Sequence, residues 1–108
     1  MQGEGAEGKL REFLREGKDW ERLRTSVPGI FVLKLPSYKG SPSRLAVELN
    51  PVDSRGTPKK RRGLVIRDKE EMEEFRRLIS DERLGKLMEE IERVNPKEKG
   101  GGEELLEI

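Results

Sequence analysis

Apolar residues recur at two different spacings along this chain, and the change of spacing separates helical from extended segments. In residues 9–20 they stand at Leu10, Phe13 and Leu14, the three-to-four spacing of an amphipathic helix, which Gly17 interrupts. Residues 1–8 are rich in glycine and lack such a pattern. We therefore expect a disordered N-terminus, residues 1–8, followed by a short helix.

Three segments farther along alternate as half-buried strands do. They cover residues 30–38, 44–52 and 63–67, with glycine and proline in the connections 39–43 and 51–63. The connection 51–63, with its run of basic residues, is expected to be an exposed hairpin. In the second segment the alternation predicts Leu45, Val47 and Leu49 inside and Glu48 outside. In the third, Ile66 is expected to face the core. The pattern predicts a three-stranded antiparallel meander, or a four-stranded sheet if residues 24–29 add a strand.

A long helical pattern follows the strands and changes face near residue 80. Asp68 and Glu71 have the spacing of a capping box at its start, and Asn95 with Pro96 ends it. The offset between its two apolar stripes favours a bend or a break near Ser80. The second stripe is either a self-association seam for a homo-oligomer or an ordinary docking face on the same core. It consists of Leu84, Leu87, Met88, Ile91 and Val94.

These segments together predict an α+β fold, in which a small antiparallel sheet of three to four strands is gripped by an N-terminal helix and a long, broken C-terminal helix. A chain of 108 residues suits one compact domain, which we place at residues 9–95. Residues 96–108 read as a flexible linker and an acidic tail. The tail either recruits a protein partner, folds back on a basic groove, or is a plain disordered end.

Composition then excludes several classes of chemistry. The chain has no cysteine and no histidine, so disulfides, the usual zinc and haem ligand sets, and Ser-His or Cys-His catalytic pairs are ruled out. No phosphate-binding glycine loop of the G-x-x-x-x-G-K-[ST] type occurs. We therefore expect a binding protein rather than an enzyme, with no cofactor and no metal.

The same composition bears on location and source. The apolar runs are far shorter than a membrane span, and the N-terminus lacks a basic-then-apolar signal peptide. We expect a cytoplasmic protein without a membrane partner. Abundant Lys, Arg and Glu, with few thermolabile residues, is the trend of hyperthermophile proteins and indicates a thermophilic, archaeal source.

Charge is sorted along the chain although the net charge is only +1. Residues 34–67 hold nine basic and two acidic residues, whereas residues 69–108 hold eight basic and thirteen acidic ones. A basic middle segment favours a face that binds a polyanion, and the alternative is a surface simply crowded with both signs. The expected phosphate contacts are Lys34, Lys39, Arg44, Arg55, Lys59, Lys60, Arg61, Arg62 and Arg67.

Binding of single strands also needs aromatic faces on which bases stack, and the chain has only five aromatic residues. We expect Phe13, Phe31 and Phe75 in the core. Trp20 and Tyr38 are left as stacking candidates, and for Trp20 a place in the core is an equal alternative.

The stretch from Arg44 to Ile79, which reads RLAVELNPVDSRGTPKKRRGLVIRDKEEMEEFRRLI, resembles the archaeal ThermoDBP-related single-stranded-DNA-binding proteins. The matching features are the LAVELNPVD strand and turn, the basic hairpin, the GLVIRD strand and the next helix. The order of elements is also similar to that of the positive-cofactor-four coactivators and the whirly proteins. The resemblance implies a helix that grips a small sheet, a basic and hydrophobic cleft for single strands, and assembly through the C-terminal helices.

The leading hypothesis is a single-stranded-DNA-binding protein, largely independent of base sequence. An alternative from another class is an oligomerising protein-interaction module that uses the C-terminal helix and the acidic tail. A third is an RNA-binding or transcription-associated protein, which only a comparison of ligands separates from the first.

Overall fold

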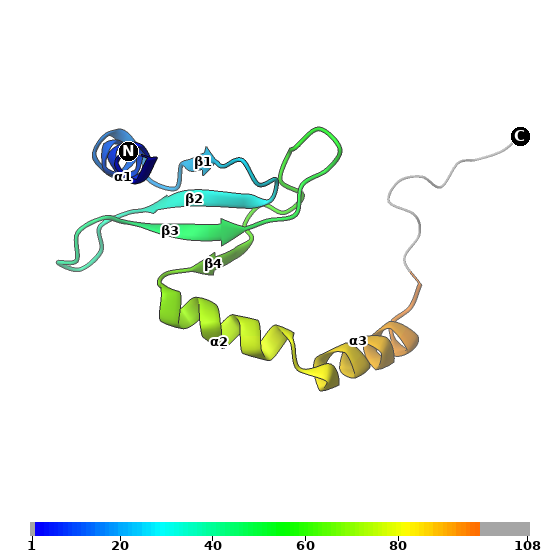
Figure 1. Cartoon of the computed structure of the whole chain (residues 1–108). Coiled ribbons are helices and arrows are strands. Elements are labelled where there is room, and N and C mark those ends of the chain that lie inside the picture. The colour runs from blue at the N-terminus through cyan, green and yellow to red at the C-terminus, as the bar shows by residue number, and fades with distance from the viewer. Residues whose placement is uncertain (1, 98–108) are drawn as a thin grey trace, which may run out of the picture. The chain divides into compact units, whose positions relative to one another are not determined.

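Helices and strands follow one another in the order α1, β1 to β4, α2, α3 (Figure 1), in a computed structural model that describes residues 2–97. The predicted α+β class is confirmed, with a four-stranded antiparallel sheet, an N-terminal helix, and a C-terminal helical region that breaks at residues 80–81. The chain divides after Met72 into two compact units. The predicted acidic tail lies outside the described residues. The elements are α1 (Gln2–Glu16), β1 (Arg22–Arg24), β2 (Ile30–Leu35), β3 (Arg44–Leu49), β4 (Leu64–Ile66), α2 (Lys69–Ile79) and α3 (Glu82–Val94).

Helix α1 begins earlier than predicted, because residues 2–8 form its first two turns instead of a disordered end. It ends at Glu16, where Gly17 N donates to Phe13 O at 2.8 Å. A Cβ atom at Gly17 would lie only 2.7 Å from the Phe13 ring, so a residue without a side chain is required here. The buried Phe13 and a 2.8 Å hydrogen bond from Lys34 Nζ to Gly17 O hold this end of the helix in place.

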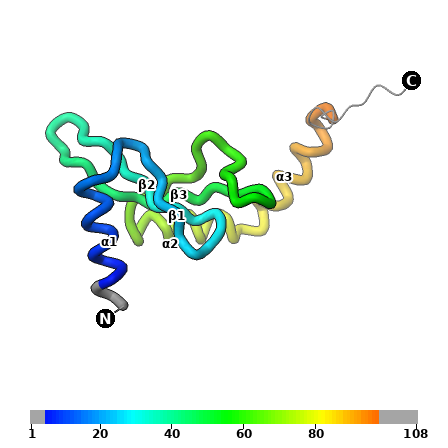
Figure 2. Tube along the Cα trace, turned by 90° about the horizontal axis from the view of Figure 1, so that it is seen from above, coloured from blue at the N-terminus to red at the C-terminus, as the bar shows by residue number. Residues whose placement is uncertain are grey.

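The sheet is an antiparallel meander in the order β1-β2-β3-β4. The fourth strand is β1, slightly earlier than the 24–29 segment considered from the sequence. Seen from above, the loop 36–43 and the connection 51–63, which we name the basic arm, leave opposite ends of the sheet (Figure 2). The register aligns Arg24, Phe31, Glu48 and Val65 in one row across all four strands, and we name the face that carries this row the arm face.

The prediction of which face of β3 is buried was wrong. Ala46, Glu48 and Asn50 are buried, while the leucines and Val47 are only half-buried on the other face. Alternation identified the two faces but not which one is covered, because β3 is an inner strand with apolar side chains on one side and a hydrogen-bonded polar pair on the other. The sequence pattern therefore favoured the more apolar face, although the arm face is the better covered one.

The core centres on Leu33, Leu35 and Ala46, against which Val65 packs. Ile66 is buried, as expected, but on the opposite face from Val65 and this core. Phe31 is buried as predicted and belongs to the arm face. Phe75, in α2, is only half-buried. The core of the sheet is thus small, and polar contacts must supply part of its order.

The predicted cap at Asp68 and the predicted helix end at Asn95 are both present, and Asp81 adds a cap that was not predicted. Asp68 accepts a hydrogen bond from Glu71 N at 2.8 Å, and the Glu71 carboxylate accepts one from Arg67 N at 2.7 Å. Asp81 caps α3, where its carboxylate accepts from Arg83 N, and Asn95 ends it. Neither α2 nor α3 has a buried residue.

The point where the arm joins β4 has no room for a side chain, which gives a test of the packing. A Cβ atom at Gly63 would collide with Leu49 O and approach Asn50 Cβ to 2.9 Å, whereas at Gly85 in α3 it would meet open space. We expect Gly63→Ala to lower the free energy of unfolding by about 2 kcal/mol. Gly85→Ala should instead stabilise α3 by about 1 kcal/mol. Urea unfolding followed by far-ultraviolet circular dichroism checks both signs, and equal effects would contradict the described packing.

Candidate nucleic-acid interface

A fully buried carboxylate lies at the centre of the arm face. Glu48 accepts hydrogen bonds from Arg22 Nε at 2.5 Å and Nη2 at 3.1 Å, from Asn50 Nδ2 at 3.1 Å, and from Gly63 N at 2.6 Å. Glu48 is 0% exposed, and in residues 2–97 no buried side-chain nitrogen or oxygen lacks a partner. Strands β1 and β3 and the end of the basic arm therefore meet at one side chain.

The network keeps this buried group ionised. Burial alone would raise the pKa of Glu48, but the hydrogen bonds from Arg22, Gly63 and Asn50 together outweigh it and hold the pKa below its ordinary value of 4.5. The hydrogen bond to Glu48 in turn raises the pKa of Arg22. The pair is charged at neutral pH, so the positive charge of Arg22 is already neutralised by Glu48.

Asn50 and Arg22 extend the network into the main chain of the arm. Asn50 Oδ1 accepts from Lys60 N at 3.1 Å, and its Nδ2 donates to Lys60 O at 2.8 Å. Arg22 Nη2 donates to Arg61 O, and Lys59 N donates to Pro51 O at 2.8 Å. The main chain of residues 59–63 is thus held by the sheet.

The side chains of this segment point away from those anchors. Lys59, Lys60, Arg61 and Arg62 are all exposed, and within the described part of the chain none of them forms an ion pair. Four adjacent cations on a fixed main chain make a dense positive surface. This confirms the predicted exposure of the basic cluster and adds an anchoring that the sequence did not reveal.

The tip of the arm is ordered by its own turn. Asp53 Oδ1 accepts from Thr57 N at 3.0 Å and from Arg55 N at 2.8 Å, and these bonds lower the pKa of Asp53. Gly56 adopts a φ of 84°, which favours glycine. The turn leaves the Arg55 side chain exposed, so it adds a fifth cation to the arm.

Trp20 lies beside the arm and is 46% exposed, so it is not a core residue. The Arg62 guanidinium stands 4.1 Å from the centre of its ring, a cation–π contact between the chain ahead of β1 and the arm. Trp20 has a φ of 70°, uncommon for a residue with a side chain, and its N–H donates to Lys34 O at 2.6 Å. The structure therefore brings together Trp20 and the cations of the arm, as a stacking site requires.

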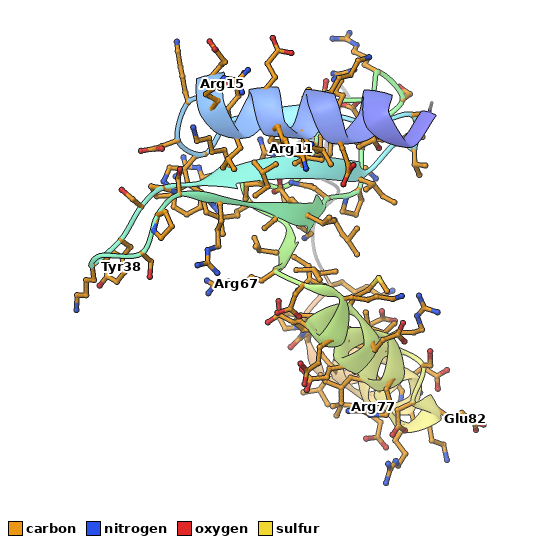
Figure 3. All side chains as sticks on the ribbon, turned by 60° about the vertical axis from the view of Figure 1, so that its left-hand side comes forward. Arg11, Arg15, Tyr38, Arg67, Arg77 and Glu82 are labelled. Carbon is orange, nitrogen blue, oxygen red and sulfur yellow. The ribbon has the colours of Figure 1, made fainter. Side chains whose placement is uncertain are left out.

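The remaining predicted contacts lie elsewhere. Lys34 is only 7% exposed and its ammonium group is used by Gly17 O, so we withdraw it as a phosphate contact. Tyr38 and Lys39 occupy the loop 36–43, at the end of the sheet opposite to the arm (Figures 2 and 3). Tyr38 is 68% exposed, and Lys39 Nζ is 5.2 Å from its ring centre. Arg44 and Arg67 are exposed at the start of β3 and just before α2.

Sequence reasoning missed the two arginines of β1. Arg22 and Arg24 flank Leu23, and both fall on the arm face through their pairing with Leu33 and Phe31. The Arg-Leu-Arg alternation was the available signal, but three residues are too few to identify a strand. The anchoring role of Glu48 could have been suspected from a charge that interrupts an apolar strand.

Comparisons with known proteins add no relative, because no protein-family model, curated sequence or solved structure matches the chain. The search of the described residues finds no helix with the length and apolar character to cross a membrane. It also finds no group of acidic side chains placed to hold a metal ion in that part of the chain.

The ionised Glu48 makes stability depend on pH. Its folded pKa is below 4.5, so its contribution to the free energy of unfolding is complete above that value and is lost as the pH falls through the folded pKa. Glu48→Gln should lower stability at neutral pH by about 3 kcal/mol, because Arg22 loses its counter-charge. Its melting temperature should then fall less between pH 5 and pH 2 than that of the wild type.

Thermal unfolding monitored by circular dichroism across that pH range measures the difference. Glu74→Gln is the matched control, because it removes an exposed carboxylate that forms no ion pair within the described residues. The control should keep the acid dependence of the wild type. An unchanged acid dependence in Glu48→Gln would show that Glu48 is not the group that titrates.

Proposed function

We propose that this chain is a binding protein for single-stranded nucleic acid, with DNA as the first ligand and little dependence on base sequence. The observation that carries the proposal is the basic arm. Its main chain is hydrogen-bonded to the sheet, its cations at residues 59–62 are exposed, and one of them stacks on the exposed Trp20. Such a protein would act on intracellular nucleic acid, which fits a cytoplasmic location.

Fixed cations suit a polyanion. Binding of phosphates releases condensed counterions, and a main chain that is already ordered loses little further entropy on binding. The Glu48 charge beneath the arm does not oppose this, because Arg22 neutralises it. The local excess of positive charge at residues 59–62 is therefore available to the ligand.

Trp20 and Arg62 supply the contact to bases. Base stacking on an aromatic ring depends little on sequence, since every base has a π face, and an arginine in the stack adds a cation–π contribution. Tyr38 and Lys39 form a smaller pair of the same kind at the other end of the sheet. A strand long enough to follow the sheet would meet both pairs.

The resemblance to the ThermoDBP-related family forms part of this proposal. The strand, basic arm, strand and helix on which it rests occur in the structure in that order, as β3, the arm, β4 and α2. Single-stranded RNA is the alternative ligand, and neither the cations nor the aromatic rings select between the two sugars.

The proposal is tested by changing Lys59, Lys60, Arg61 and Arg62 together to alanine. Fluorescence anisotropy of labelled single-stranded DNA, single-stranded RNA and duplex DNA at two salt concentrations gives the affinities. We expect the variant to bind single strands roughly 100-fold more weakly at low salt and the slope of log K against log salt to fall by about 3, since four phosphate contacts are lost. The emission of Trp20, the only tryptophan, should be quenched by single strands in the wild type.

The matched control removes four exposed cations outside the arm, at Arg77, Lys86, Arg93 and Lys97. It has the same net charge as the arm variant and should keep most of the affinity. Equal loss in both variants would mean that net charge, not the arm, governs binding. No binding of any of the three ligands at low salt would overturn the proposal.

Helix α3 favours a second role, self-association. Every residue of its apolar stripe is exposed, and the exposed fractions range from 38% at Ile91 to 82% at Val94. Such an apolar stripe is costly to leave in water. The five residues predicted from the sequence as a seam, at positions 84, 87, 88, 91 and 94, make up this stripe. We propose a homo-oligomer joined through α3, in agreement with the family expectation.

Leu87→Gln with Ile91→Gln tests this role without a change of charge. Light scattering coupled to size-exclusion chromatography should give an oligomer for the wild type and a monomer for this variant. Glu89→Gln with Arg93→Gln, on the polar side of the same helix, should remain oligomeric. A monomeric wild type at high protein concentration would contradict the seam.

A further inference from the structure

A small hollow lies between the turn that follows β1 and the beginning of the basic arm, away from Trp20. Its volume is about 120 Å³. Its apolar lining comes from Val27, Pro28, Ile30, Phe31 and Val52, and Arg24, Thr25, Gly29 and Gly56 complete it. The apolar floor distinguishes this place from the exposed cations of the arm at residues 59–62.

The walls of the hollow are held by hydrogen bonds. Thr25 Oγ1 donates to Ile30 O at 2.7 Å, and Asn50 N donates to Gly29 O at 2.8 Å. Gly29 has a φ of 97°, which allows the tight turn, and Ile30 N closes it by donating to Val27 O at 3.0 Å. The polar groups of this turn are thus used within it, and the hollow is pre-formed.

The volume of the hollow is close to what a single ring fills. An engineered protein cavity of roughly 150 Å³ takes up benzene, and pockets for drug-sized ligands start at roughly 300 Å³. A pyrimidine, with one six-membered ring, fits the smaller class, whereas a purine has two fused rings. The apolar lining suits the flat faces of such a ring.

Arg24 is the charged side chain that lines the hollow. It is exposed, it forms no ion pair within residues 2–97, and its guanidinium lies beside the arm, 3.5 Å from where a Cβ of Gly56 would stand. Pyrimidines carry carbonyl oxygens that accept hydrogen bonds, and a guanidinium offers five donors. Arg24 is therefore the group that can orient a base in the hollow.

We propose that this hollow binds one pyrimidine base of the bound strand, with Arg24 donating to a carbonyl oxygen of the ring. As a site on a strand it rests on the proposed function, which treats binding as largely independent of sequence. The hollow adds a preference for a pyrimidine at one position. Arg24 and the hollow were not among the contacts expected from the sequence.

The base site is tested first without a strand. Thymidine 5′-monophosphate and adenosine 5′-monophosphate are titrated into the full chain, and the methyl resonances of Val27, Ile30 and Val52 are followed by NMR. We expect thymidine 5′-monophosphate alone to shift these methyl signals. Arg24→Ala should weaken that binding about tenfold, and Val27→Met, whose longer side chain can occupy the hollow, should do the same. Arg11→Ala, a cation of α1, is the control that should change nothing.

Strands then separate this inference from the proposed function. A series of ten-nucleotide thymidine strands carries a single adenosine, placed at a different position in each strand. The wild type should bind one strand of this series more weakly than the others, whereas Arg24→Ala should bind all of them equally. Methyl shifts with the mononucleotide but no strand binding would overturn the proposed function and leave the hollow a nucleotide site. Strand binding without any shift of the methyl signals would overturn the proposal that the hollow binds a pyrimidine base. Equal shifts with both nucleotides would overturn it as well.

Discussion

The structure of the sheet depends on a buried charge, the Glu48 carboxylate. Moving an isolated carboxylate out of water is costly, and a charge with no partner is not tolerated in a core. Glu48 meets this requirement with donors from β1, from the residue that follows β3 and from the residue that precedes β4. These contacts form only when the register of the strands and the path of the arm are both correct. A small apolar core thereby gains specificity that its few buried side chains could not supply.

The same network connects the fold to the proposed site. Asn50 and Arg22 use their remaining hydrogen-bonding groups on the main chain of Lys60 and Arg61, so the segment that carries the cations is a continuation of the sheet's polar interior. Ordinary basic loops are mobile and lose entropy when a ligand orders them. Here the main chain is ordered before any ligand is present, which leaves only the long side chains to adjust to phosphates. Trp20 lies against Arg62 near the end of the arm, and its backbone N–H is held by a hydrogen bond to Lys34 O.

The sequence predicted features governed by local chemistry. The capping pair Asp68 and Glu71, the break before Asp81 and the exposed basic cluster all follow from neighbouring residues, and the structure confirms them. The buried face of β3 could not be predicted from neighbouring residues, because it depends on contacts between Glu48 and residues far away in the chain. Arg22 and Arg24 were missed for the same reason, since their importance lies in their register with Leu33 and Phe31. The burial of Lys34 depends on Gly17, seventeen residues earlier, and was equally invisible.

Amide hydrogen exchange at Gly63 tests the central claim, that a buried carboxylate fixes the arm. Gly63 N donates to Glu48, whereas Lys39 is an exposed residue of the loop 36–43 and serves for comparison. If Glu48 fixes the arm, Gly63 and Lys60 exchange as slowly as the amides of β2 and β3, and far more slowly than Lys39. Exchange of Gly63 at the rate of Lys39 would show that the arm is not held by the sheet, and would contradict the account.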